Sequence, residues 1–438
     1  MSKGIAVVDI GSTGIRVLVA KVSEGRGPQI IAKADVVCKG AVKNLEIENT
    51  EEISQSLKRI LSRIKDQTGL VIKSAYFNIS GDKVSFMPNT DSIVISSNED
   101  ELAENSVTNK TIGMLLDRIA SVELYEDEML IDVLPRQYYV AYGDGRFDTK
   151  VNDPAGLNCS KIKADADVIV GKSSYMENVK TCAANAGIEV DGFITFSFAM
   201  PKVLPESLLN SPDGSEQSVL VIDIGGNATE YVLYYKGMPY TVGAIPVGGA
   251  NITNDVAVVL NISPSEAEQL KQDYSLADDE LVTNDIDVEI YPLDVGVKDV
   301  VKVSYIVQIM QARIINIFDG VADELADEGI DSSLIDSIVL CGNGIDSFKG
   351  LERACAAALG HEPTVVDLSS ETGMKSSYSY ACGMLRYMAG QLKYGRKASK
   401  ISRECQQVTE EIRPEEEKKG VISELKSRFK NMIESFKD

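Results

Sequence analysis

Two short stretches with one shared pattern constrain the fold of this chain more than any other feature. In each, an apolar run ends at an aspartate and breaks into a glycine turn, as Asp-Ile-Gly-Ser-Thr at residues 9–13 and as Asp-Ile-Gly-Gly-Asn at residues 223–227. Such a run predicts a central β-strand, and the glycine lets the backbone turn so that its N–H groups face an anion. The spaced pair predicts two similar halves that close on one phosphate chain. Two ordinary strand–turn corners are the alternative.

The residues of these turns form a candidate phosphate and metal site. The hydroxyl groups of Ser12 and Thr13 add donors to the backbone N–H groups. Asp9 and Asp223 can hold Mg²⁺ through water, because this ion keeps several waters and takes few protein ligands. The predicted phosphate-binding residues are Asp9, Gly11, Ser12, Thr13, Asp223, Gly225, Gly226 and Asn227.

Composition excludes several classes of function. The 438 residues suffice for two lobes with separate cores. A formal net charge of −22 argues against nonspecific nucleic-acid binding, which rests on cationic surface. The seven cysteines are an odd number without a Cys-x-x-Cys pair, so we expect neither a disulfide framework nor a zinc site, but a reducing cytoplasm. No apolar run approaches the ~20 residues of a membrane span, and no secretory leader is recognisable.

The order of predicted elements divides the chain into modules. Residues 82 to about 163 form an inserted module, after which a strand over 163–170 is expected to resume the first lobe. From residue 218 the second lobe repeats the plan of the first, and it contains a long helix predicted over 298–325. Residues 393–419 mix charges with polar residues and proline, which predicts a flexible linker.

The last nineteen residues, 420–438, have the pattern of an amphipathic helix. At 100° per residue the apolar side chains fall within an arc of about 120°, and basic side chains flank both of its edges. Such a helix lies in a membrane interface, where basic side chains reach lipid phosphates. A helix that docks back on the protein, or a short coiled-coil end, is the alternative. The predicted membrane-binding residues are Val421, Ile422, Leu425, Lys426, Arg428, Phe429, Lys430, Met432, Ile433, Phe436 and Lys437.

Together these motifs resemble the actin superfamily and, within it, the FtsA family of bacterial cell-division proteins. The first turn would also suit sugar kinases of that superfamily. More specific to FtsA are the second-lobe segments 245–257 and 266–271, the segment Val-Leu-Pro-Arg-Gln-Tyr at 133–138, and Ser-Tyr-Ala-Cys-Gly-Met-Leu at 379–385. The tethered amphipathic end is similar as well. The resemblance covers nearly the whole chain.

The resemblance implies an α/β fold that is actin-like and ribonuclease-H-like, with two lobes around a nucleotide cleft. An FtsA-type subdomain would be inserted in the first lobe. The implied modules are a first lobe at 1–81, 164–205 and about 376–392, the inserted subdomain at 82–163, a second lobe at 206–375, a linker at 393–419 and a membrane-targeting helix at 420–438.

The resemblance also implies ligands and further site residues. ATP with Mg²⁺ is the implied cofactor. Glu268 and Lys271 match residues that face the ribose and adenine, and the loop of Gly342, Asn343 and Gly344 matches the adenosine-side glycine loop. The subdomain at about 250–325 would capture the tail of the tubulin-like protein FtsZ, with Arg313 near that contact.

The implied function is an ATP-binding membrane adaptor that polymerises, anchors FtsZ filaments to anionic lipids at the cytoplasmic face of the division site, and helps recruit later division proteins. The sequence departs from the family at Asn227, Ala228, Glu230, Asn316 and Asn343. The connector 195–201 carries no carboxylate to serve as a general base, so any ATP hydrolysis should be slow and no catalytic residue is assigned. A pilus or secretion adaptor similar to PilM, and a small-molecule kinase of the same superfamily, stay open as alternatives.

Overall fold

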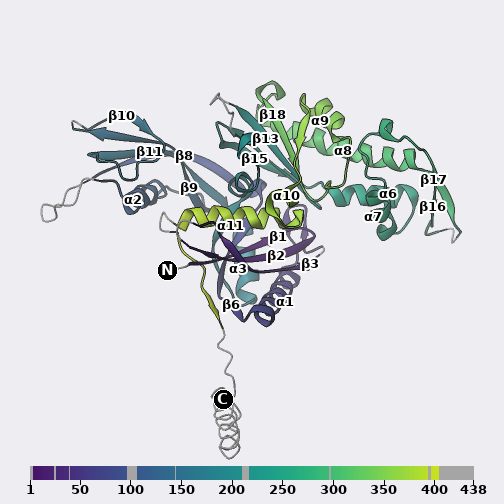
Figure 1. The fold of residues 1–438 in the computed structure, drawn as a ribbon, viewed down its shortest axis with the longest axis horizontal. Helices are drawn as coiled ribbons and strands as arrows, with labels where there is room; N and C mark the ends of the chain where they lie inside the picture. Colours follow the sequence, from purple (N-terminus) through teal and green to yellow (C-terminus); the bar gives the residue numbers. More distant parts are fainter. Residues whose placement is uncertain are drawn as a thin grey trace, which may run out of the picture. The chain divides into compact units, whose positions relative to one another are not determined.

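The computed structural model describes residues 3–23, 26–38, 40–95, 106–143, 145–209, 217–294, 297–392 and 396–403. The chain divides into two compact units, Met1–Ser402 and Arg403–Asp438. The first unit contains both predicted lobes (Figure 1). The predicted amphipathic helix at 420–438 lies outside the described residues.

A five-stranded sheet in the order β12-β7-β1-β2-β3 forms the first lobe. In β1, Ala6 and Val8 pack with helices α1 and α3, whereas Ile5 and Val7 pack with α11 on the other face. Both faces are covered, which explains why β1 is apolar from Ile5 to Val8 rather than alternating. The elements are β1 (Lys3–Ile10), β2 (Gly14–Val22), β3 (Gln29–Val37), β4 (Val42–Lys43), β5 (Glu46–Ile47), α1 (Thr50–Thr68), β6 (Leu70–Ile72), β7 (Ser74–Ile79), α3 (Ser173–Asn185), β12 (Glu189–Thr195) and α11 (Ser379–Gln391).

The second lobe repeats this plan with a sheet in the order β15-β14-β13-β18-β19. In each lobe the first strand runs antiparallel to the second and parallel to a later strand, so the predicted internal repeat is confirmed. The elements are α4 (Phe196–Ala199), α5 (Glu206–Leu209), β13 (Ser218–Ile224), β14 (Thr229–Tyr235), β15 (Met238–Ile245), α6 (Gly249–Leu260), α7 (Pro264–Asp273), β16 (Asp287–Ile290), β17 (Asp299–Lys302), α8 (Val303–Asp327), β18 (Ser337–Cys341), α9 (Leu351–Leu359), β19 (Pro363–Val365) and α10 (Leu368–Thr372).

The long second-lobe helix begins later than the predicted 298. Residues 299–302 pair with β16 as strand β17, and α8 then runs from Val303 to Asp327. Its buried face, which includes Ile306, Met310 and Phe318, packs against the sheet side that carries Leu220 and Ile222.

A separate four-stranded sheet, in the order β10-β9-β11-β8, forms the inserted subdomain. The prediction that 163–170 resumes the first lobe is wrong, because β11 pairs along its length with β8 and β9 of this sheet. Its apolar stretch 168–170 resembles a central lobe strand because both faces are buried. Val168 and Val170 pack in the core of the inserted subdomain, and Ile169 packs in a core shared with β1 and α11. The elements are β8 (Val84–Val94), α2 (Asn109–Ile119), β9 (Glu128–Tyr142), β10 (Arg146–Val151) and β11 (Lys161–Lys172).

Part of the predicted flexible linker at 393–419 is ordered. Strand β20 (Ile401–Arg403) pairs with β6, and the backbone N–H of Lys73 donates to the carbonyl of Lys400 at 2.8 Å. The charged composition of 393–419 predicted a solvated segment, but distant carboxylates and an unpaired strand edge supply partners for residues 396–402. Within the described part of the chain, no helix is long and apolar enough to cross a membrane.

Candidate functional site

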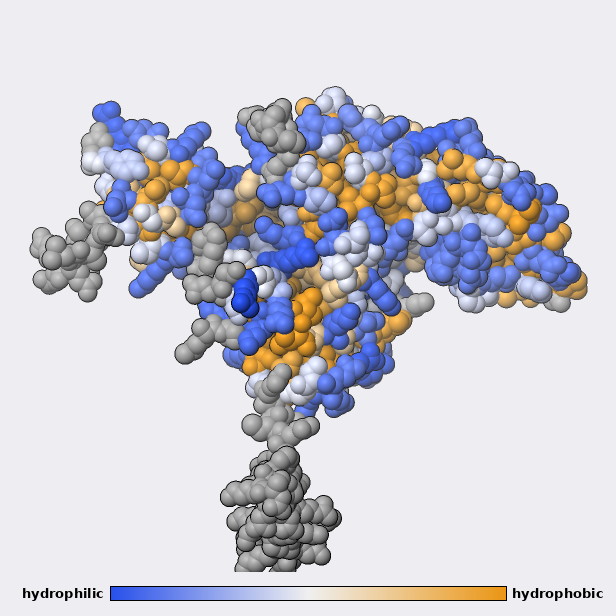
Figure 2. All heavy atoms as spheres, viewed as in Figure 1, coloured by the Kyte–Doolittle hydropathy of each residue, from blue (hydrophilic) through white to orange (hydrophobic). Residues whose placement is uncertain are grey.

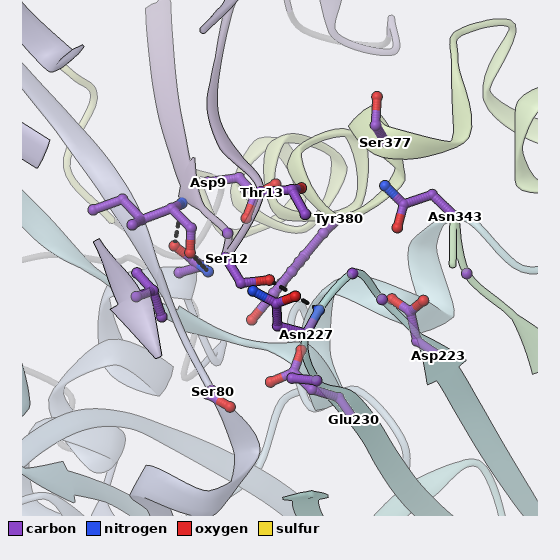
Figure 3. A pocket seen from close by; sticks show the side chains of 18 of the residues that line it. Asp9, Ser12, Thr13, Ser80, Asp223, Asn227, Glu230, Asn343, Ser377 and Tyr380 are labelled. Carbon is purple, nitrogen blue, oxygen red and sulfur yellow. Dashed lines mark hydrogen bonds between the residues drawn. The ribbon is translucent and has the colours of Figure 1, made fainter. Parts of the chain in front are cut away.

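A cavity of about 140 Å³ lies where the ends of β1 and β13 face each other. It is lined by both Asp-Ile-Gly turns, by the loop after β18, and by the start of α11 (Figure 3). Of the residues predicted from the sequence, it brings together Asp9, Gly11, Ser12, Thr13, Asp223, Gly225, Gly226, Asn227, Gly342 and Asn343.

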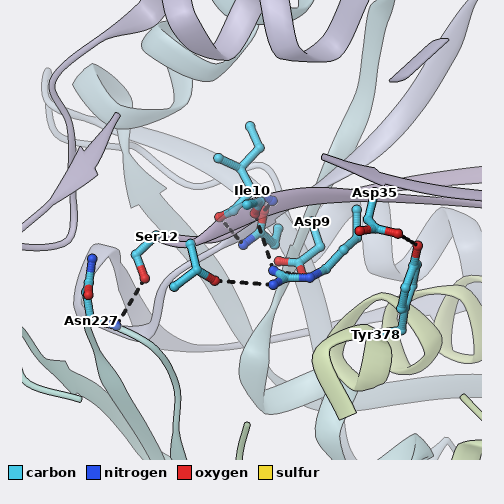
Figure 4. Close-up of polar contacts among 10 residues, drawn as sticks. Asp9, Ile10, Ser12, Asp35, Asn227 and Tyr378 are labelled. Carbon is cyan, nitrogen blue, oxygen red and sulfur yellow. Dashed lines mark hydrogen bonds and ion pairs between the residues drawn. The ribbon is translucent and has the colours of Figure 1, made fainter. Parts of the chain in front are cut away.

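The two turns contact each other directly. The backbone N–H of Asn227 donates to the Ser12 Oγ at 3.1 Å (Figures 3 and 4). Beside this bond, a Cβ placed on Gly226 would lie 2.3 Å from the Cγ2 of Thr13. The second glycine of the Asp-Ile-Gly-Gly stretch therefore allows the close approach of the two lobes at this point.

Glycines also pack the later loops against the second turn. The N–H of Gly249 donates to the carbonyl of Gly225 at 2.9 Å, and the N–H of Gly344 donates to the carbonyl of Ile224 at 2.8 Å. Gly342 has a φ of +119°, and a Cβ there would lie 2.3 Å from both the Asp223 Oδ1 and the Ile224 carbonyl oxygen. This packing brings Asn343 to the cavity, whereas Gly344 lies behind the turn and does not line the cavity.

In the first turn, the carboxylate is compensated by a cation on the neighbouring strand. Asp9 and Arg16 are partners in the β1–β2 register, and Arg16 Nη1 lies 3.4 Å from Asp9 Oδ2 (Figure 4). Arg16 Nη2 also donates to the Thr13 Oγ1 at 3.3 Å. Burial raises the pKa of Asp9 from its ordinary value, while the charge of Arg16 opposes that rise.

In the second turn, the equivalent partner is a second acid. Asp223 and Glu230 are partners in the β13–β14 register, and both line the cavity. Burial, followed by the nearby charges of Asp346 and Asp9, raises the pKa of Asp223 to about 7. Burial raises the pKa of Glu230 to about 8, although the N–H of Gly81 donates to its Oε1 at 3.0 Å.

Glu230 was noted in the sequence only as a departure from the family pattern. The structure makes it a cavity residue that joins the second lobe to the Ser80–Gly81 turn of the first. The signal that could have found it is spacing, since Glu230 follows Asp223 at the same interval at which Arg16 follows Asp9.

The raised pKa of Glu230 predicts that the protein loses stability as pH rises. Because its pKa is about 8 in the fold and near 4.5 when unfolded, the folded chain retains a proton that the unfolded chain releases between these values. The free energy of unfolding should therefore fall as pH rises from about 5 to about 8, by on the order of 2 kcal/mol. Thermal melts at pH 5.5, 7 and 8.5 measure this, and Glu230→Gln should make the profile less steep, with the remaining slope due to Asp223, whose pKa is raised to about 7.

Asp331→Asn is the matched control for this melt series. Hydrogen bonds from Ser333 lower the pKa of Asp331, so the contribution of Asp331 to the free energy of unfolding changes only at acid pH. A Glu230→Gln profile as steep as that of the unaltered chain would contradict the assignment.

Comparisons with known proteins agree with the fold. The family model "Cell division protein FtsA" matches residues 220–384, and the model "SHS2 domain inserted in FTSA" matches residues 83–170. Together they match more than half of the chain, including the second turn and the whole inserted sheet up to residue 170. The chain belongs to the FtsA family. The resemblance inferred from the motifs is confirmed, and the domain match to residue 170 agrees with the placement of β11 in the inserted sheet.

The relatives of this FtsA-family chain span most of its length. Cell division protein FtsA of Escherichia coli strain K12 is 24% identical over 399 residues, which are 88% of this chain and 90% of that protein. The FtsA protein of Bacillus subtilis is 24% identical over 335 residues, 76% of this chain and 72% of that protein. A chain of the solved PilM-PilN type IV pilus biogenesis complex aligns with a TM-score of 0.53 at 16% identity, covering 89% of this chain and 98% of that chain. This last likeness shows the actin-like fold alone.

Two residues that the FtsA resemblance assigns to the nucleoside lie beside the cavity and do not line it. Lys271 is buried on α7, where its Nζ lies 2.8 Å from Glu268 Oε2 and donates to the Gly249 carbonyl at 3.2 Å. Since the N–H of Gly249 bonds to Gly225, this pair supports the second turn from behind. The hydrogen bonds and charge of Lys271 lower the pKa of Glu268 despite partial burial.

Arg313, the predicted partner-binding residue, lies on α8 away from the cavity. Its Nε and Nη2 donate to the two carboxylate oxygens of Asp255 on α6, at 2.6 and 3.0 Å. Its Nη1 donates to the Oδ1 of Asn316 at 2.8 Å, so the family departure at Asn316 is a direct neighbour of this arginine.

Proposed function

We propose that this chain is an ATP-binding, actin-like adaptor that polymerises and anchors FtsZ filaments to the cytoplasmic face of the cell membrane at the division site. Recruitment of later division proteins is part of the same role. The observation that carries the proposal is the contact between two Asp-Ile-Gly turns across one cleft, in a chain of the FtsA family. The amphipathic pattern of residues 420–438 supports the membrane part of the role.

The polar groups around the cleft fit a nucleotide with a divalent cation. The turn backbones, Ser12 and Thr13 would hold the phosphates, and Asn343 would lie on the nucleoside side. Asp223 would hold Mg²⁺ through water more readily than Asp9, whose carboxylate already faces Arg16. Bound Mg²⁺ would supply charge neutralisation for the phosphates.

The size of the cavity indicates that nucleotide binding requires movement. Pockets for small-molecule ligands such as nucleotides usually measure about 300–1,000 Å³. The cavity between the two turns measures about 140 Å³. The contacts that would separate are the bond between Asn227 and Ser12 and the contact between Gly226 and Thr13. A nucleotide would therefore set the spacing of the two turns and bias the conformations that polymerise.

The subdomain around α6, α8 and the β16–β17 hairpin offers an apolar surface for the FtsZ tail (Figure 2). Val258 and Val259 on α6 are 70% and 50% exposed, and Tyr305 on α8 is 47% exposed. The ion pair of Arg313 with Asp255 holds α8 to α6 across this region. Exposed apolar groups beside a fixed guanidinium suit a short peptide that carries both apolar and acidic side chains.

Titration of a labelled FtsZ C-terminal peptide with the full chain, followed by fluorescence anisotropy, tests this proposal. We expect saturable binding, and Arg313→Glu should weaken it at least tenfold because it reverses the charge beside the apolar groups and opposes Asp255. Arg353→Glu is the matched control, since Arg353 pairs with Asp278 and Glu280 on another part of the lobe.

Two results would count against the proposal. If Arg313→Glu and Arg353→Glu weaken peptide binding equally, the peptide does not bind at the surface beside Arg313. Capture of a pilus-assembly peptide together with no response to the FtsZ peptide would favour the PilM-like alternative.

A further inference from the structure

Residues 396–402, here called the strap, are held along the edge of the first lobe after α11. The backbone N–H of Ser399 donates to the Gly4 carbonyl at 2.9 Å, and the Ser399 Oγ accepts from the N–H of Ala6 at 3.1 Å. The hydroxyl of Tyr76 donates to the carbonyl of Lys397 at 2.8 Å. The strap is thus bonded to β1 and β7, the central strands of the lobe.

Two adjacent basic residues of the strap face two buried carboxylates from different parts of the fold. Arg396 forms an ion pair with Asp132, which is 9% exposed and lies on β9 of the inserted sheet. Lys397 Nζ lies 3.4 Å from the Oδ1 of Asp191 on β12 of the first lobe, and the Asp191 side chain is fully buried. That Oδ1 has no hydrogen-bond partner within the described residues, so Lys397 is its compensating contact there.

An open pocket lies beside the junction that the strap crosses. A cavity of about 740 Å³ lies among α2, β9 and the end of α11, and Asp132, Tyr387 and Arg396 are among its lining residues. Tyr387 of α11 donates from its hydroxyl to the Asp132 Oδ2 at 3.0 Å. Apolar side chains such as Ile131 and Ile169 pack the inserted sheet against the first lobe, and the polar contacts to Asp132 add to this packing beside the cavity.

We propose that the strap is a releasable latch that holds the inserted subdomain against the first lobe. When the strap is bound, Arg396 and Lys397 neutralise the negative charges of Asp132 and Asp191. When the strap is released, both carboxylates stay buried without a cation beside them. Arg403 links the strap to residues 404–438, so a force from that side acts first on the pairing of β20 with β6 and then on the two ion pairs. The latch does not depend on what residues 404–438 bind, and its test uses no lipid or partner.

Hydrogen exchange of the full-length chain, read by mass spectrometry, tests the latch. Arg396→Gln should raise exchange at least tenfold in β9 around Asp132 and in the last turn of α11. The double variant Asp132→Asn with Arg396→Gln should return exchange toward that of the unaltered chain, because it removes the buried charge along with its partner. Lys400→Gln is the matched control, because Lys400 pairs with the exposed Glu189 and should leave β9 unchanged.

Two truncations separate the latch from general loss of stability. A chain that ends after residue 403 should exchange like the full chain, whereas one that ends after residue 395 should exchange in β9 at least as fast as Arg396→Gln, because it also loses Lys397. If the shorter chain keeps full protection of β9, or if the double variant exchanges as fast as Arg396→Gln, the latch is overturned.

Discussion

Removal of residues 420–438 is expected to abolish sedimentation of the protein with anionic liposomes. We expect the partition coefficient to fall at least about 100-fold, because this ratio corresponds to about 2.8 kcal/mol, which the burial of one or two large apolar side chains supplies. The deleted segment carries seven apolar residues on one predicted stripe with basic residues at both edges. Raised salt should weaken the binding of the full chain, since the basic residues act through exposed charge.

Two point variants sharpen this experiment. Phe429→Asp places a charge in the middle of the apolar stripe and should reproduce most of the loss. Glu434→Gln alters the opposite side of the predicted helix and should leave binding intact or slightly stronger, because it removes a negative charge. Unchanged sedimentation of the deleted chain would show that the segment is not the membrane anchor.

Gly342→Ala is expected to have the largest effect of any single substitution at the cleft. The new Cβ would lie 2.3 Å from two oxygen atoms and 2.5 Å from the backbone nitrogen of Ile224, at a φ of +119° that side chains rarely adopt. Relief requires the loop after β18 to move off the second turn. We expect a loss of more than about 3 kcal/mol in the free energy of unfolding, measured by urea denaturation, because overpacking and backbone strain both contribute.

The same variant should lose binding of a fluorescent ATP analogue at concentrations that saturate the unaltered chain. Gly390→Ala on α11 is the matched control, because a Cβ there meets nothing within 4 Å. It should stabilise the helix by about 0.5–1 kcal/mol and leave nucleotide binding intact. If Gly342→Ala unfolds at the same urea concentration as the unaltered chain, the close packing of the two loops is not required.

The sequence predicted the parts of the fold that depend on local pattern. The two Asp-Ile-Gly stretches were expected to be strand ends that meet, and they do, because an apolar strand followed by glycine has few alternatives. The sheet to which β11 belongs could not be predicted in this way. Its apolar residues 168–170 suit a lobe strand and an inserted strand equally, and the choice depends on pairing with β8 and β9.

The strap and Glu230 were missed for a related reason. Residues 396–402 are polar and charged, as linkers are, and their partners Asp132 and Asp191 lie more than 200 positions earlier in the chain. Glu230 has meaning only once β14 is paired with β13 in register. For the strap, no local signal exists, and the distant partners had to be known first. For Glu230, the seven-residue spacing after Asp223 was a signal, but its meaning depends on the β13–β14 register.

The strand registers give the two walls of the cleft different charges. Asp9 is opposite Arg16 on one wall, which pairs an acid with a base, whereas Asp223 is opposite Glu230 on the other wall, which pairs two acids. Without a cation, burial raises the pKa of Asp223 to about 7 and that of Glu230 to about 8, so the acidic wall retains protons near neutral pH. A polyphosphate that arrives with a divalent cation brings the missing positive charge to the acidic wall. Under the proposed function, the cleft would favour the metal complex of a nucleotide over the free anion, because the cation would replace protons on the acidic wall.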